Sequence, residues 1–200
     1  MTPALLSLLT ACQTAPLKYD QIQEGHWESR ALIRDQQEQR SFIVNLSINA
    51  VKNEKLRVDA TSTLGAHLAS LVLREDEVRY LLPGERRFFF GAARPEAMIP
   101  VISVPMSPSY LHNLLFEQPI TEGDWLCERD SRGYLTVCQS ESEGLKISWQ
   151  DRSQTARRVL IEHERAQVQV NLTSFQEQLE SRAELFELSP PQGFRQFRLR

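Results

Sequence analysis

The sequence predicts a mainly β protein, built as one large antiparallel sheet that curls to cover its own apolar face. About a dozen short segments after residue 41 follow the period-two pattern of apolar and polar residues that half-buried strands show. A hydrophobic content of 41% is enough for a sizeable core, and 200 residues suit a single domain. Many short strands at near-regular spacing favour a curled sheet or barrel.

The N-terminus has the features of a lipoprotein signal. An apolar run from Ala4 to Leu9 leads into two small residues and then Cys12. This order resembles the bacterial lipobox, at which the signal peptide is cut and the cysteine is lipidated. Residues 1–11 contain no Lys or Arg, although secretory signals begin with a positive segment and run to about 15–30 residues. We therefore expect a signal peptide over 1–11, clipped or with its true start upstream, then a lipidated tether over 12–20 beginning at Cys12, and one domain over 21–200.

The alternation delimits the strands in chain order. In the first half, the expected strands are 42–48, 56–60, 71–73, 78–82 and 86–90, separated by breaks at 53–54, 63–66, 75–76 and 83–84. In the second half, they are 125–127, 134–138, 145–149, 159–162, 168–172, 185–188 and 194–199. The stretch 173–183 fits a loop with some helix as well as it fits a strand.

Two short helices are expected between the two groups of strands. Residues 94–102 carry apolar side chains at close to helical spacing, and Pro100 limits the length of this helix. Ser107 and Pro108 then predict an N-cap followed by proline at the first helical position, with the helix continuing to Glu117. Helices at this point could plug the mouth of the curled sheet.

Cys127 and Cys138 flank a predicted hairpin turn at 130–133. A two-residue turn at Arg132 and Gly133 would place the cysteines opposite each other, whereas a three-residue loop would shift the register by one and separate them. In an oxidising periplasm, a disulfide and two independent half-buried thiols both fit this spacing. A cysteine pair without clustered histidines is a poor metal site, so no metal is expected.

Other function classes lack their sequence signatures. The four histidines are scattered, and no nucleophile elbow, phosphate loop or glycine-rich dinucleotide turn is present. We therefore expect a binding protein without a catalytic site or cofactor, apart from the N-terminal lipid. A net charge of −3 does not indicate a nucleic-acid partner. After residue 11, no apolar stretch reaches the roughly 20 residues of a membrane span, so membrane attachment would come through Cys12.

Several segments, taken in order, resemble those of LolB, the outer-membrane lipoprotein family that receives other lipoproteins and inserts them into that membrane. The matching segments are 35–37 with the strand 42–48, 56–59 through 63–66 to 71–73, 80–88, 102–108 with 111–115, and 186–193. Ser103 stands where this family favours a glycine-like residue, and Ser62-Thr63 replaces an Asn-Pro-like turn. No single segment is specific, and their order carries the resemblance.

The resemblance implies an unclosed antiparallel β-barrel of ten or more strands with short plugging helices. It also implies a lipid-anchored carrier on the periplasmic face of the outer membrane of a Gram-negative bacterium. Such a carrier takes lipoproteins from a LolA-like periplasmic carrier, binds their acyl chains in an apolar cavity and inserts them into the membrane. Leu64, with Gly65, matches the leucine at the tip of the membrane-insertion loop of that family. Gln13 after the lipidated cysteine also favours the outer membrane, because an aspartate there favours the inner one.

Inward-facing apolar positions of the strands and helices are the candidates for the lining of an acyl-chain cavity. They are Val44, Leu46, Leu56, Val58, Leu71, Val78, Tyr80, Met98, Leu111 and Leu115. Every β-sandwich needs the same pattern, so each of these positions fits a plain core as well. Two alternatives to lipoprotein insertion therefore stay open: a protein of the same fold that binds another hydrophobic ligand, and a structural or assembly lipoprotein with a filled core.

Overall fold

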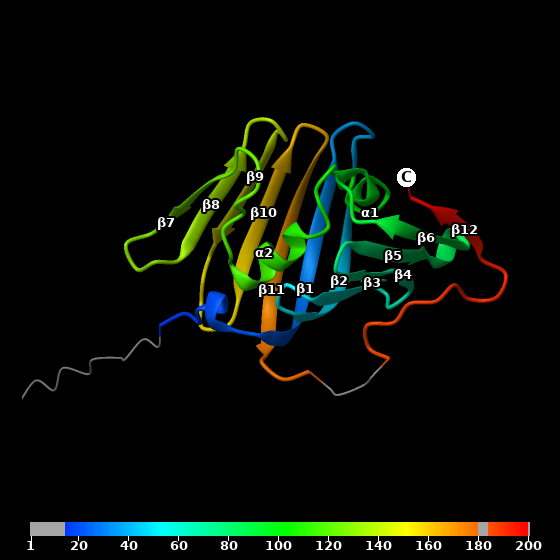
Figure 1. Cartoon of the computed structure of the whole chain (residues 1–200), viewed down its shortest axis with the longest axis horizontal. Coiled ribbons are helices and arrows are strands. Elements are labelled where there is room, and N and C mark those ends of the chain that lie inside the picture. Colours follow the sequence, from blue (N-terminus) through cyan, green and yellow to red (C-terminus); the bar gives the residue numbers. More distant parts are fainter. Residues whose placement is uncertain (1–14, 180–183, 200) are drawn as a thin grey trace, which may run out of the picture.

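The computed structural model describes residues 15–179 and 184–199 of the chain. Twelve strands form a single sheet in the order β12-β6-β5-β4-β3-β2-β1-β11-β10-β9-β8-β7. All neighbouring pairs are antiparallel except β12 and β6, which run parallel. The outer strands β12 and β7 do not pair with each other, so the curled sheet stays open (Figure 1). The predicted fold class, a mainly β unclosed barrel with short helices, is confirmed.

The chain lays down the sheet in two runs. The first comprises β1 (Glu24–Asp35), β2 (Arg40–Val51), β3 (Lys55–Ser62), β4 (His67–Arg74), β5 (Glu77–Leu82) and β6 (Arg87–Ala92). The second comprises β7 (Leu126–Arg129), β8 (Leu135–Ser140), β9 (Leu145–Gln150), β10 (Arg157–His163) and β11 (Ala166–Gln176), after which β12 (Arg195–Arg198) follows. The pairing of β1 with β11 joins the two runs into one sheet.

The helices lie between the two runs, as the sequence predicts. They are the 3₁₀ turn η3 (Pro95–Met98), α1 (Ile99–Ile102) and α2 (Tyr110–Phe116), and they cover the inner face of the sheet (Figure 1). Phe116 of α2 is fully buried and packs edge-on against Trp27 of β1, with ring centroids 5.4 Å apart. This aromatic contact holds the helical segment against the centre of the sheet.

The start of α2 differs from the prediction. Ser107 does not cap the helix: its hydroxyl bonds to that of Ser109 at 2.7 Å, and α2 begins only at Tyr110. The N–H groups of Tyr110 and Leu111 donate to the carbonyls of Ser107 and Pro108, which are i to i+3 bonds. The chain therefore enters α2 through a tighter turn than the capped entry that the Ser-Pro pair suggests.

The alternation of apolar and polar residues did not predict the strand β1. Its inward positions include Gly25 and Ser29, both buried, between the apolar Trp27, Ala31 and Ile33. A glycine and a serine at core positions interrupt the apolar half of the pattern, so local alternation is weak there. The strand forms because it pairs along its length with both β2 and β11.

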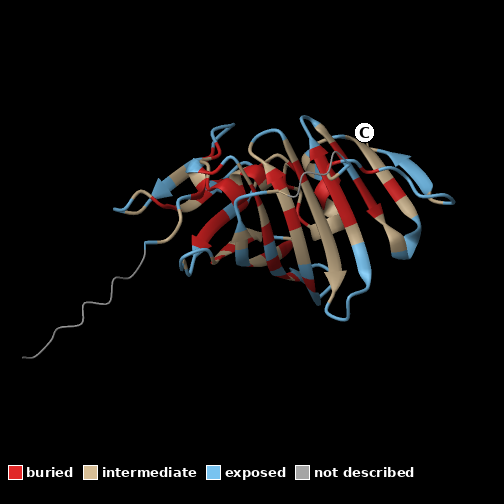
Figure 2. Ribbon diagram, turned by 90° about the horizontal axis from the view of Figure 1, so that it is seen from below, coloured by how far each residue is buried: buried red, intermediate tan, exposed pale blue. Residues whose placement is uncertain are grey.

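The segment expected as a strand at 185–188 is irregular. Arg57 of β3 donates from Nη1 to the carbonyl oxygens of Leu185 and Glu187, at 3.1 and 3.3 Å. These carbonyls are therefore bonded to a side chain, whereas in a strand they would bond to the backbone of a neighbouring strand. Leu188 instead packs on the outer face of the sheet with Val72, Leu81 and Phe88. A small second core thus covers the outside of the sheet where β4, β5 and β6 lie, and the main core lies on the inside. In Figure 2 the buried residues lie mostly along the strands, and the connecting loops are largely exposed.

The packed domain begins earlier than residue 21. Residues 15–20 belong to the expected tether, yet Tyr19 is buried and its hydroxyl donates to the carbonyl of Thr155 at 2.6 Å. The N–H of Leu17 donates to the carbonyl of Gln154, and the Tyr134 hydroxyl donates to that of Pro16. The segment after residue 15 therefore lies against the β9–β10 connection and the β7–β8 loop.

Candidate functional site

A cavity lined by apolar side chains lies between the inner face of the sheet and the helical segment. Its volume is about 250 Å³, and all 25 lining residues are aliphatic, proline, alanine, methionine or phenylalanine. Strands β1 to β5, β10 and β11 contribute to the lining, as do α1 and α2. Because antiparallel strands turn every second side chain inward, the sequence alternation produces this lining directly.

Eight of the ten positions proposed from the alternation line this cavity. They are Val44, Leu46, Leu56, Val58, Leu71, Met98, Leu111 and Leu115. Val78 and Tyr80 are not lining residues, and this part of the expectation is wrong. Both are fully buried in the core, and Tyr80 stacks on Phe89 with centroids 4.6 Å apart. The aromatic pair fills the space beside β5 that the cavity would otherwise occupy.

Other lining residues lie on β10 and β11, which were expected as strands without a role in the cavity, and on β1, which was not predicted as a strand. Val159 and Ile161 of β10 and Val168, Val170 and Leu172 of β11 face it, as do Ala31 and Ile33 of β1. In β10 and β11, apolar and polar residues alternate as clearly as they do in β2. The sequence does not show which strands lie near β2 in the sheet. The pairing of β1 with β11 brings β10 and β11 close to β1 and β2 in the part of the sheet that lines the cavity.

The mouth of the cavity is marked by the lining residues that also reach solvent. Phe42 of β2 and Leu68 of β4 are each 40% exposed, and Pro100 of α1 is exposed as well. Phe42 lies two residues beyond the last β2–β3 pair, Val44 with Ser62, so it stands beside the β3–β4 loop. The cavity thus opens between α1 and the ends of β2 and β4.

Leu64 lies at the tip of the β3–β4 loop and is 96% exposed. Among the described residues, the large hydrophobic side chains that are exposed are Phe42, Ile43, Leu64, Leu68, Leu126 and Phe197. Phe42, Leu64 and Leu68 lie on the ends of β2 and β4 and on the loop between β3 and β4, and we call these three residues the apolar rim. Ile43 follows Phe42 on β2, so its side chain points to the opposite face of the sheet. Leu126 and Phe197 lie on the edge strands β7 and β12. The rim therefore continues the apolar lining from the mouth out to the loop tip.

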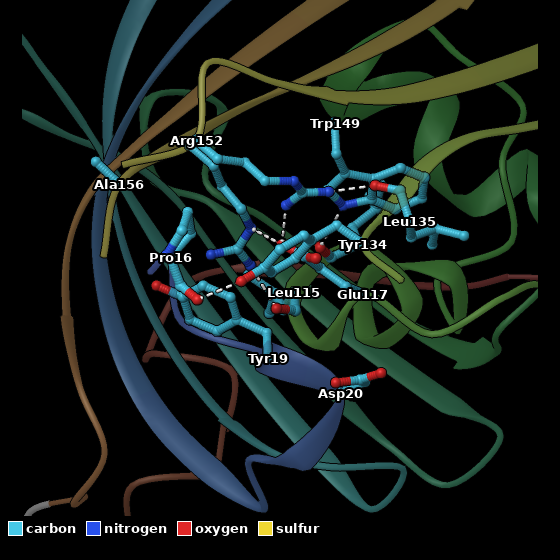
Figure 3. A network of polar contacts seen from close by, with 12 residues as sticks. Pro16, Tyr19, Asp20, Leu115, Glu117, Tyr134, Leu135, Trp149, Arg152 and Ala156 are labelled. Carbon is cyan, nitrogen blue, oxygen red and sulfur yellow. Dashed lines mark hydrogen bonds and ion pairs between the residues drawn. The ribbon is translucent and has the colours of Figure 1, made fainter. Parts of the chain in front are cut away.

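The helix α2 is held over the cavity by a buried polar network (Figure 3). Glu117, which follows α2, forms ion pairs with Arg152 and with Arg157 Nε, the latter at 3.0 Å. Arg157 also donates to the carbonyl of Leu115 and stacks over the ring of Tyr19 at 3.6 Å. Burial lowers the pKa of Arg157 to about 10, so its guanidinium stays charged at neutral pH. The network ties α2 to β10 and to the N-terminal segment.

His112 is the buried histidine of α2. Its ring stacks on Phe116, and its Nδ1 has no hydrogen-bond partner within the described chain. Burial lowers the pKa of His112 to about 4, so the ring is neutral at pH 7. A neutral imidazole suits the apolar underside of the plug, because a charged one would be desolvated without a compensating contact.

Cys127 and Cys138 form a disulfide, with their Cα atoms 4.1 Å apart. The connecting loop, 131–133, has three residues, for which a separation of the cysteines was expected. The register is restored by a bulge: Arg129 pairs with Leu135 but Glu128 with Val137, which leaves Thr136 without a direct partner. The extra residue compensates for the odd loop length and places the two cysteines opposite each other.

The described residues offer little to other classes of site. No cluster of His, Cys, Asp or Glu suited to a metal ion occurs in 15–179 and 184–199. No helix of the described part is long and apolar enough to cross a membrane. Cys12 and the signal segment 1–11 lie outside the described residues.

Comparison with known proteins identifies the fold. No family model matches the chain, and no curated protein matches it in sequence. A LolA superfamily protein from Nitrosomonas europaea is similar in structure, with a TM-score of 0.54 at 8% identity over 86% of this chain and 94% of that one. A putative outer membrane lipoprotein-sorting protein domain from Vibrio parahaemolyticus gives a TM-score of 0.50 at 8% identity, covering 82% and 88%. The chain therefore has the LolA-superfamily fold.

Proposed function

We propose that this protein is a lipid-anchored carrier that binds the acyl chains of lipoproteins and helps to insert them into the outer membrane. The observation that carries the proposal is the continuity between the apolar cavity and the exposed Leu64. A chain that leaves the cavity at Phe42 and Leu68 meets the loop tip next. Membrane attachment through Cys12 would hold this rim close to a bilayer.

The cavity has the chemistry of an acyl-chain site. All of its lining side chains are apolar, so it selects for apolar chains and leaves any headgroup outside the mouth. An apolar cavity of about 150 Å³ already takes up benzene. The 250 Å³ of this structure has room for a longer apolar segment, and each buried CH₂ contributes about 0.8 kcal/mol. Transfer onward requires only that the bilayer bind the chain more strongly.

A LolA-like periplasmic carrier is the partner that this proposal calls for. Support comes from the shared fold and from the lipoprotein-sorting domain among the similar structures. The second candidate is a carrier of another hydrophobic ligand, which the same purely apolar lining favours because it recognises no headgroup. A structural lipoprotein with a filled core fits less well, because the core of this protein contains a void.

The experiment is a two-step transfer. A labelled lipoprotein is loaded on a LolA-type carrier, the full chain is added, and the label is followed first onto this protein and then into liposomes. Ala60→Phe places a ring at a lining position that is only half-buried, and it is expected to reduce acquisition at least fivefold with little change in thermal unfolding. Leu126→Phe, on the distant edge strand, is the matched control and should acquire normally.

The two candidates give different results. If the protein strips the lipoprotein from its carrier and deposits it in liposomes, lipoprotein insertion is supported. If it takes up a fluorescent fatty acid but no lipoprotein, the second candidate is correct. If neither ligand binds, the cavity has no carrier role and the proposal is wrong.

A further inference from the structure

Two hairpin loops of this protein have the same turn conformation but differ in charge, and this difference matters for contact with a membrane. The loops are Ser62–Ala66, between β3 and β4, and Asp130–Tyr134, between β7 and β8. In each, the first residue donates its N–H to the carbonyl of the fifth, at 2.8 and 2.9 Å. In each, the fourth residue is a glycine with φ of +85°, a backbone conformation that favours glycine.

The side chain of the first residue organises both turns in the same manner. Ser62 Oγ accepts the N–H groups of Leu64 and Ala66, at 3.3 and 3.0 Å. Asp130 Oδ1 accepts those of Arg132 and Tyr134, at 2.9 and 3.0 Å. The glycine N–H is bonded in both loops as well, to the carbonyl of the first residue. Three consecutive loop N–H groups are therefore satisfied within each turn.

The two loops differ in charge and in the residue at the tip. The β7–β8 loop uses a carboxylate and carries Arg132, both suited to water. The β3–β4 loop uses an uncharged hydroxyl and carries Leu64. In a bilayer, an unbonded N–H is strongly unfavourable, and a buried carboxylate is unfavourable as well. Of the two solutions to one turn, only that of Ser62 meets both demands.

We propose that Ser62 is the positioning residue that allows the Leu64 loop to enter a bilayer. Its hydroxyl holds two loop N–H groups internally, without adding a charge, so these groups keep their hydrogen bonds when the tip leaves water. This inference rests on the proposed function, in which Leu64 meets the membrane. It adds that the neutrality of the residue at 62, and not only the apolar tip, determines insertion.

The test separates the hydrogen bonding of residue 62 from the charge of residue 62. Leu64→Trp in the full chain reports insertion through quenching by brominated phosphatidylethanolamine and phosphatidylglycerol vesicles, with the unsubstituted chain as background. The three native tryptophans are buried and contribute little. Ser62→Asn and Ser62→Asp are then added separately, since both provide an acceptor at the same place. Asp130→Asn is the matched control in the other loop.

We expect Ser62→Asn to retain the quenching of the tryptophan introduced at position 64 within twofold, and Ser62→Asp to reduce that quenching at least fivefold, with both variants melting like the parent. Ser62→Ala frees two N–H groups that water satisfies, so it should also fold normally and insert less. Asp130→Asn should change nothing. Equal quenching for Ser62→Asn and Ser62→Asp would overturn the role of Ser62 alone. If Leu64→Trp itself is not quenched, the loop does not reach the membrane and the proposed function is contradicted.

Discussion

Leu64 has a role in the proposed function and none in the packing of the core. It is almost fully exposed at a loop tip, where it makes no contribution to the core. An exposed leucine alone proves nothing, because folded proteins expose much apolar surface. Its loop joins β3 to β4 at the end of the sheet where Phe42 and Leu68 mark the cavity mouth, and this position suggests the role proposed for it.

Replacing Leu64 by Glu is therefore expected to separate release from binding. The change should alter the free energy of unfolding by no more than about 0.5 kcal/mol, as is usual at exposed sites. Acquisition of lipoprotein should persist, while deposition into liposomes falls strongly because a carboxylate must enter the bilayer. Leu126→Glu is the control, an exposed leucine of β7 far from the rim in the sheet order. Normal deposition by the Leu64→Glu protein would contradict the mechanism.

His112 makes stability depend on pH. Because the pKa of His112 is lowered to about 4 in the folded protein, against about 6.5 in the unfolded chain, the unfolded state binds the proton more readily between these values. Stability should fall as pH decreases from 7 to 4, by up to roughly 3 kcal/mol from this residue. Chemical denaturation at pH 7, 5.5 and 4 measures it. His112→Asn should flatten the slope, and an unchanged slope would show that other groups cause it.

At the scale of elements, α2 and the β7–β8 hairpin have different tasks. The helix forms part of the cavity wall and is fixed from three sides, by Trp27, by Trp149 and by the Glu117 network. The hairpin lies at the end of the sheet and contributes no lining residue. Its disulfide should accordingly support stability and leave the cavity unchanged.

Reduction of the Cys127–Cys138 bond tests this division. The bond closes a loop with a sequence separation of 11, for which the chain-entropy relation gives about 3 kcal/mol. Reductant should lower the free energy of unfolding by about that amount, while the affinity for a fluorescent fatty acid stays within twofold. A thiol count on denatured, unreduced protein checks the premise. Two free thiols there would show that the bond does not form.

At the scale of the whole molecule, the open sheet and its inserted helices enclose an apolar cavity whose lining reaches solvent at Phe42 and Leu68 of the rim. A closed barrel would seal the lining from solvent, and a filled core would leave no space for a ligand. In the proposed function, membrane attachment depends on Cys12, which lies outside the described residues.

Cys12→Ala is expected to release the protein from membranes. Several acyl chains on an N-terminal cysteine anchor stably, whereas an unlipidated chain has no comparable anchor. After ultracentrifugation of cell envelopes, the substituted protein should appear in the supernatant or as an unprocessed precursor, and intact mass should show no lipid. Unchanged fractionation and mass would show that Cys12 is not the lipidation site.

The sequence by itself determined the class of fold, most strands and the place of the helical segment. These follow from alternation and helical spacing among near neighbours, which the backbone geometry of each element imposes locally. The same alternation determined that Val44 and Leu56 face inward. It could not distinguish them from Val78 and Tyr80, because facing inward does not show whether a neighbour from another element fills the space.

Only the tertiary structure decided which inward residues line a void, how β1 joins β11, and how the cysteines align. Phe89 fills the space beside Tyr80, whereas β10 and β11, more than 100 residues along the chain, leave the cavity open beside β2. The sequence allowed a two-residue or a three-residue loop between the cysteines. The structure has the three-residue loop, and the bulge at Thr136 corrects the register so that the cysteines still lie opposite each other. These features depend on contacts between residues far apart in the chain, where packing and register, and not local periodicity, determine the outcome.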